Sequence, residues 1–124
     1  MSSMMGQLTD WQVGQFIALL LAGKHYASLH NGDPGLGSPT STEVPGASYQ
    51  RQPCTFVAVG NRAIRTSNGQ SWPSLGETVV THIGIWDDAH NGNLRAVVTL
   101  VSPYYVTEGG AFGLNAGDLY YRWP

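Results

Sequence analysis

Glycine and proline divide this chain into short segments, and this limits the possible folds more than any other feature of the sequence. The 124 residues include 16 glycines and 7 prolines, and the segments between them are rich in Val, Thr, Tyr and Trp. Glycine and proline interrupt helices and long strands, whereas β-branched and aromatic residues favour extended structure. The sequence therefore predicts short strands joined by tight turns.

One segment departs from this pattern and predicts an α-helix over residues 9–22. Thr9 followed by Gln12 has the spacing of a capping box, and Gly23 is placed to end the helix. Apolar residues recur at the spacing of one helical face, at Val13, Phe16, Ile17 and Leu20. Leu19 and Leu21 widen that face, so the helix either packs deeply on a sheet or is shared with a neighbouring subunit.

The rest of the chain predicts strands at residues 24–30, 53–59, 62–66, 79–86, 94–101, 104–107 and 118–123. Asn91-Gly92 is a hairpin turn signal and predicts that 79–86 and 94–101 pair antiparallel. Alternation within 79–86 predicts one face made of Val79, Thr81, Ile83 and Ile85. Residues 67–77 are expected to form a loop anchored by Trp72.

These elements predict a mainly β fold, an antiparallel β-sandwich or jelly-roll-like barrel with one N-terminal α-helix. We expect residues 1–8 to be a flexible N-terminal arm and residues 9–124 to form a single domain. A long loop over about residues 31–48 is rich in Gly, Ser, Pro and Thr. Loops of this length are usually functional or ordered by a partner.

The charge and apolar patterns argue against nucleic acid and membranes as partners. Only 11% of residues are charged, the net charge is −2, and the basic residues are scattered along the sequence. Phosphate neutralisation needs a clustered basic face, so we expect no nucleic-acid binding. The apolar stretch 16–22 is too short to span a bilayer and lacks the preceding Lys or Arg of a signal peptide. We therefore expect no membrane association, and we expect the chain to be made and used in the cytosol.

The sequence holds no recognisable catalytic, cofactor-binding or metal-binding pattern. Cys54 lies in an apolar run, which favours a buried, unreactive thiol. His25 and His30 are separated by an odd number of positions, so one strand directs them to opposite faces. Calcium remains an alternative to ordinary turn residues in one loop, at Asp87, Asp88, Asn91 and Asn93. We expect a protein without enzyme activity, cofactor or metal.

Aromatic residues suit this chain to contacts with other proteins. Tyr104-Tyr105 and Tyr120-Tyr121 are adjacent on predicted strands, so each pair should have one ring inward and one outward. Together with the four tryptophans, the outward rings favour subunit interfaces, and stacking on sugars is the alternative.

A series of short motifs runs through the chain from the helix onward: Leu29-His30 before Gly32-Asp33-Pro34, Glu43-Val44, Tyr49, Arg51-Gln52, the run Val80 to Asp87, Gly92-Asn93-Leu94, and Ala116 to Leu119. In this order they resemble a family of small virion proteins of tailed phages and prophages, often labelled tail fibre or minor structural protein. The resemblance covers most of the chain. It implies a structural role in the virion, without catalysis or a cofactor.

Two roles in the virion are compatible with this resemblance. A fibre is expected to show repeats or heptads, whereas this chain has neither and has only enough residues for one globular domain. A small domain with a loose N-terminus, a long loop and low charge looks more like a capsid decoration or cement protein on the outer surface of the head. Such proteins typically clamp the joints between capsid subunits, often as trimers. The expected partners of the chain are the major capsid protein, other virion proteins and sister copies. The alternative is a minor tail protein or a small tail-fibre or receptor-binding component.

The candidate interface residues come from the helix, the long loop and the aromatic strands: Trp11, Phe16, Asp33, Pro34, Glu43, Tyr49, Arg51, Trp86, Tyr105 and Tyr121. Glu43 and Arg51 flank a turn-rich segment and are predicted to form an ion pair that holds the long loop on the sheet. A surface pair contributes less than about 1 kcal/mol, so its expected role is to fix the loop's shape for docking.

Overall fold

The computed structural model describes residues 7–35 and 39–123. In chain order the elements are α1 (Asp10–Leu21), β1 (His25–His30), the 3₁₀ helix η1 (Pro39–Thr42), β2 (Gln52–Cys54), β3 (Phe56–Val59), β4 (Ala63–Thr66), β5 (Gln70–Leu75), β6 (Thr78–Trp86), β7 (Leu94–Val106), β8 (Gly110–Leu114) and β9 (Tyr120–Arg122). Within the described residues, none of the helices has the length and apolar character needed to cross a membrane.

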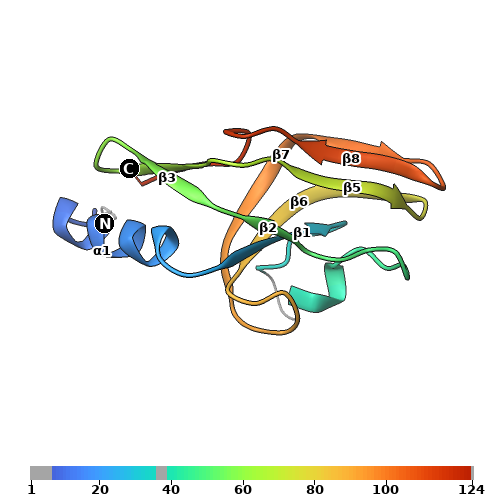
Figure 1. The fold of residues 1–124 in the computed structure, drawn as a ribbon, viewed down its shortest axis with the longest axis horizontal. Coiled ribbons are helices and arrows are strands. Elements are labelled where there is room, and N and C mark those ends of the chain that lie inside the picture. The colour runs from blue at the N-terminus through green and yellow to red at the C-terminus, as the bar shows by residue number, and fades with distance from the viewer. Residues whose placement is uncertain (1–6, 36–38, 124) are drawn as a thin grey trace, which may run out of the picture.

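The described strands pair antiparallel into three sheets. Their orders are β2-β1-β6-β7, β3-β4-β9 and β5-β8. The sheets form an open, sandwich-like arrangement, and α1 lies at one end of the long axis, beside the C-terminus (Figure 1). The turns that join β5 to β6 and β7 to β8 lie at the other end (Figure 1). The predicted mainly β class with an N-terminal helix is confirmed.

The main core lies between the four-stranded sheet and the strands that face it. Leu29 and Ile83 contribute from β1 and β6, while Trp72 and Phe112 contribute from the β5-β8 pair. Trp72 is 2% exposed, which agrees with its predicted role as an anchor. The core joins residues that are far apart in the sequence, so it depends on the whole fold.

The predicted helix forms as α1 and packs on the sheet through one side only. Thr9 Oγ1 accepts a hydrogen bond from the Gln12 backbone N–H at 3.2 Å, which caps the first turn. Gly23 follows the helix with a φ of 73°, a conformation that glycine adopts without strain. A second, smaller core joins the helix to β4 through Val13, Ile17, Leu20 and Ile64.

Residues 67–77 are not simply a loop, because they contain β5. The expectation was wrong because Pro73 and two serines give this segment a weak strand pattern. Its pairing with β8 shifts register between Trp72 and Leu75, and this irregularity accommodates the proline. The strand Gly110–Leu114 was also missed, since its glycines read as turn residues.

The segments 94–101 and 104–107 are one strand, β7, and not two. In its pairing with β6, His82 lies opposite Thr99 while Val80 lies opposite Tyr104, so β7 carries extra residues between them. Pro103, which has no N–H to donate, lies in this bulge. The shift also corrects the predicted alternation, because Val80 joins Ile83 and Ile85 in the core.

The segment 53–59 was predicted as one strand and is divided at Thr55. Its first part pairs with β1 and its second part with β4, so the chain passes from one sheet to another there. The loop over residues 31–48 contains η1, and Glu43 makes an isolated bridge to His30. Most of the predicted N-terminal arm, and residues 36–38 of the loop, lie outside the described residues.

Candidate functional site

The predicted ion pair between Glu43 and Arg51 is present, and it is buried. Arg51 donates from Nε to Glu43 Oε2 and from Nη2 to Glu43 Oε1, both at 3.0 Å. The side chains of Arg51 and Glu43 are 5% and 14% exposed, so the estimate for a surface pair does not apply. The two parallel bonds fix the guanidinium in one orientation.

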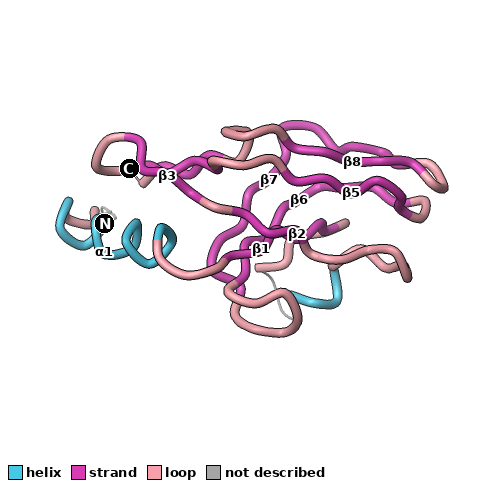
Figure 2. The backbone as a smooth tube through the Cα atoms, in the orientation of Figure 1, coloured by secondary structure: helices cyan, strands magenta, loops and turns pink. Residues whose placement is uncertain are grey.

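The same guanidinium joins the long loop to the loop between β6 and β7. Arg51 Nη1 donates to the carbonyl oxygens of Asp88 at 3.1 Å and Asn91 at 2.7 Å. The two loops lie together beside the four-stranded sheet (Figure 2). Asn91 and Gly92 have φ values of 57° and 80°, as the predicted Asn-Gly turn requires. Arg51 therefore holds together two segments that have no strand pairing with each other.

Arg51 also lies on Trp86, on the face of the sheet opposite the main core. Its Cζ is 3.7 Å from the centre of the Trp86 ring, a cation–π contact. Trp86 Nε1 donates to Ser28 Oγ at 2.7 Å, and His30 stacks against the same ring at 6.5 Å between centroids. These groups, with Glu43, Tyr49 and Thr42, are called the polar cluster below.

His30 is fully buried in the polar cluster, where its ring is neutral. Thr42 donates its hydroxyl to the Pro39 carbonyl, so it accepts from His30 Nδ1 at 2.9 Å. A neutral ring with its proton on Nδ1 leaves Nε2 to pair with Ser28 Oγ at 2.5 Å, and the Ser28 hydroxyl also lies 3.3 Å from the Gly84 carbonyl oxygen. Burial lowers the pKa of His30 from 6.5 to about 4 and outweighs the opposing effect of Glu43.

The charges of the polar cluster are satisfied within it. Burial raises the pKa of the Glu43 carboxyl, but hydrogen bonds from Arg51 and Tyr49 outweigh this, and the pKa is lowered. Tyr49 donates to Glu43 Oε2 at 2.5 Å and accepts from the Leu29 N–H at 3.1 Å; burial and this carboxylate raise its pKa. Such a cluster shapes the loop and leaves few groups for a ligand.

The remaining histidines and the acidic loop residues are not part of the polar cluster. His25 packs edge-on against Phe56, on the face opposite His30, as predicted. In the described ranges no three His, Cys, Asp or Glu side chains are grouped so that they could hold a metal ion. Asp87 accepts from the N–H and side-chain amide of Asn93 at 2.7 and 3.0 Å, which is the turn-residue role.

A second feature is an apolar face on α1, which the sheet does not cover. Trp11 is 71% exposed, Leu19 53%, Leu21 44% and Phe16 37%. Of the two predicted alternatives for the helix, deep packing on the sheet is therefore wrong. The side of α1 that faces away from the sheet is therefore apolar and exposed to solvent.

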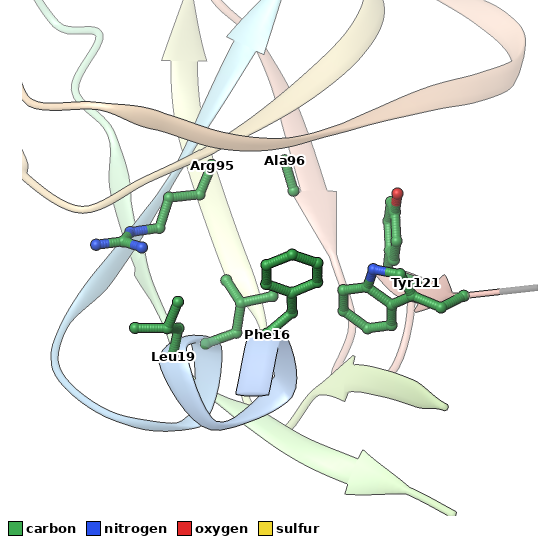
Figure 3. A pocket seen from close by; sticks show the side chains of 7 residues that line it. Phe16, Leu19, Arg95, Ala96 and Tyr121 are labelled. Carbon is green, nitrogen blue, oxygen red and sulfur yellow. The ribbon is translucent and has the colours of Figure 1, made fainter. Parts of the chain in front are cut away.

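Beside this face lies an apolar hollow between α1, β7 and β9, which we call the helix hollow. Its volume is about 360 Å³, and its lining is Phe16, Leu19, Leu20, Arg95, Ala96, Tyr121 and Trp123. Phe16 and Tyr121 stand on two sides of it, with Ala96 at its back and Arg95 at its edge (Figure 3). Tyr121 and Trp123 pack edge to face at 4.6 Å between centroids.

We predicted that each tyrosine pair has one ring inward, but neither pair buries a ring. Tyr104 and Tyr105 are 50% and 78% exposed, and Tyr120 and Tyr121 are 48% and 39% exposed. Tyr104 packs edge-on against Phe112 at the border of the core. Both strands lie at the edge of their sheets, so even a ring that faces the core is only partly covered.

The candidate interface residues divide into two groups in space. One group is part of the polar cluster or packs beside it, and Pro34, Arg51 and Trp86 are buried there, with Glu43 and Tyr49 partly buried. The exposed members are Trp11, Phe16, Asp33, Tyr105 and Tyr121. Sequence reasoning missed Arg95 and Trp123 as neighbours of Phe16, although the widened apolar face at Leu19 pointed to a contact there.

The comparison with protein families agrees with the resemblance found in the sequence. Residues 8–122 match the family described as Podophage GP4 fiber I protein gp80. The chain is a structural protein of the tailed-phage virion. It belongs to the family of this podophage fibre protein. A comparison with curated proteins gave no match.

Proposed function

We propose that this chain is a fibre component of the phage tail that works by binding other virion proteins and copies of itself, without catalysis. The observation that carries this proposal is the family match over residues 8–122, whose description names a fibre protein. The family favours the tail alternative over the capsid decoration that the sequence alone favoured. The exposed apolar face of α1 supports a role in assembly.

The structure supports a non-enzymatic role through the polar cluster. Ser28 and His30 form a close hydrogen bond, but both are 0% exposed, so a substrate would not reach the hydroxyl. The charged groups Glu43 and Arg51 are bound to each other and to backbone carbonyls. The cluster suits a fixed loop presented to a partner protein.

The location in the particle tests this proposal. Purified particles are separated into heads and tails, and the chain is quantified in each fraction by mass spectrometry against the major capsid protein. Recovery with tails, at a copy number far below that of the major capsid protein, supports a fibre component. Recovery with heads, at a copy number close to that of the capsid protein, overturns it in favour of decoration.

A further inference from the structure

We propose that the helix hollow binds the opposite end of a second copy of this chain, so that copies join head to tail. The inference rests on the proposed fibre function, because it identifies the partner of the exposed apolar face. It is argued from the shape and charge of two surfaces at the two ends of the molecule.

The helix hollow selects an apolar group that has a carboxylate beside it. Its lining is apolar except for Arg95, and it contains no acidic side chain. Arg95 contacts Asp87 at 3.6 Å, which is longer than a hydrogen bond, so its guanidinium donors can still bind a carboxylate of a partner beside the hollow. Arg65 of β4 and Arg122 of β9 are also exposed, and these two strands pair with each other.

The opposite end of the chain carries that combination of groups. Tyr105 is 78% exposed on β7 and lies opposite Val79 of β6. Glu77 lies in the same surface region, and its backbone N–H donates to Glu108 Oε2 at 3.1 Å, so both carboxylates are at this end. We call Tyr105, Glu77 and Glu108 the acidic tip.

Trp11 beside Asp10 is a competing aromatic and acidic pair, but it fits less well. Asp10 already forms an ion pair with Arg62, and Trp11 lies on the same helix as the hollow. A contact through Trp11 would be a symmetric helix-to-helix dimer. The acidic tip instead offers unlike charges to the basic side of the hollow, which favours it as the occupant.

The positions of the two surfaces determine what kind of assembly the contact produces. The helix hollow is lined by residues of α1, the start of β7 and the C-terminal segment, and α1 and the C-terminus lie at one end of the long axis (Figure 1). The residues of the acidic tip lie in or next to the turns that join β5 to β6 and β7 to β8, at the other end (Figure 1). Two different surfaces in contact make a heterologous interface, which repeats unless rotation closes it into a ring. Contacts between opposite ends of a long axis produce an extended row of subunits.

Two variants that each block one surface test the inference on the full-length chain. Leu19→Glu places a charge in the helix hollow, and Tyr105→Thr removes the ring of the acidic tip. Each variant alone is expected to be monomeric by sedimentation velocity. The wild-type assembly is expected to grow beyond a trimer as the protein concentration rises. An equimolar mixture is expected to form dimers and stop, because one intact hollow meets one intact tip and both outer ends are blocked.

Charge reversal tests the electrostatic part. Arg95→Glu is expected to weaken association about tenfold or more, and adding Glu77→Lys to the same chain is expected to restore it, because in the double variant every hollow meets a tip of opposite charge. Arg65→Glu, an exposed arginine that does not line the hollow, is the matched control and should change little. Circular dichroism and thermal unfolding verify that each variant is folded.

Three results would overturn the inference. They are a wild type that is monomeric at every concentration, a Tyr105→Thr variant that still associates as the wild type does, and a wild-type assembly that stops at a closed dimer or trimer. The first of these, found together with tail localisation of the chain, removes the head-to-tail contact and leaves the proposed fibre function intact. Localisation on heads removes the fibre function whatever the association state.

Discussion

The guanidinium group of Arg51 lies 3.7 Å from the centre of the Trp86 ring and is held there by paired bonds to Glu43. This relationship connects the long loop, the four-stranded sheet and the loop between β6 and β7. A buried ion pair is weak evidence of net stability, but the loss of one partner leaves the other charge buried and unpaired. The geometry of the long loop therefore depends on Arg51.

The first prediction concerns that dependence. Arg51→Ala is expected to lower the free energy of unfolding by about 3–5 kcal/mol, measured by urea denaturation, because Glu43 remains buried without its cation. Backbone amides over residues 39–48 are expected to exchange faster. Arg95→Ala is the control: its pair at 3.6 Å is partly exposed, and it should cost about 1 kcal/mol or less. Equal losses in the two variants, with unchanged exchange in the loop, would contradict this role.

The second prediction concerns pH. The pKa of His30 is about 4 in the folded chain and 6.5 in the unfolded chain, so the unfolded state binds the proton more tightly. Stability is therefore full above pH 6.5 and falls as the pH is lowered through this window, by about 3 kcal/mol at most. Unfolding measured at a series of pH values checks this.

His25 and Glu43 also make the chain less stable as the pH falls, and substitutions of the two histidines separate these contributions. Burial lowers the pKa of His25, and Glu43 also has a lowered pKa, whose stabilisation is lost only below its ordinary value of 4.5. His30→Gln should therefore flatten the curve between pH 6.5 and 4.5 more than His25→Gln does. If both variants keep the wild-type slope, His30 is not the group that titrates.

The third prediction compares two glycines. A Cβ at Gly84 would lie 2.6 Å from Ser28 Oγ and 2.8 Å from His30 Nε2, so Gly84→Ala should destabilise the chain by about 1–3 kcal/mol. A Cβ at Gly14 of α1 meets nothing within 4 Å, so Gly14→Ala should stabilise it by about 0.5–1 kcal/mol. Thermal unfolding of both variants measures the difference. A neutral Gly84→Ala would mean that the polar cluster has room to move.

The fourth prediction concerns the cysteine. Cys54 is 2% exposed, and burial raises the pKa of its thiol to about 12. Because the thiolate is the reacting species, iodoacetamide at neutral pH should modify Cys54 slowly in the folded chain and rapidly in urea. Intact-mass spectrometry follows the modification. Rapid modification of the folded chain would show that the strand carrying Cys54 opens readily.

Local sequence patterns predicted the elements that local interactions stabilise. The cap at Thr9, the apolar spacing of α1 and the Asn91-Gly92 turn each depend on residues within a few positions, and each is present. The ion pair between Glu43 and Arg51 was also predictable, because a short turn-rich segment separates them. Its burial was not, since Trp86 and the Asp88 carbonyl that enclose it come from distant positions.

The elements that were missed depend on pairing with distant strands. Residues 70–75 carry a proline and little apolar alternation, and they form β5 because β8 pairs with them across a register shift. The exposure of Tyr105 and Tyr121 depends on which sheet edges stay uncovered, and a sequence pattern holds no information on that. The same is true of the helix hollow, which joins α1 to β7 and β9.

The sequence by itself therefore determined the class of the fold, the helix, the hairpin turns and the resemblance to a virion protein family, because turn chemistry and side-chain periodicity act over a few residues. Tertiary structure alone decided which apolar faces became core and which stayed in solvent. That choice depends on how the sheets stack, and burial is a property of neighbours that are distant in the chain.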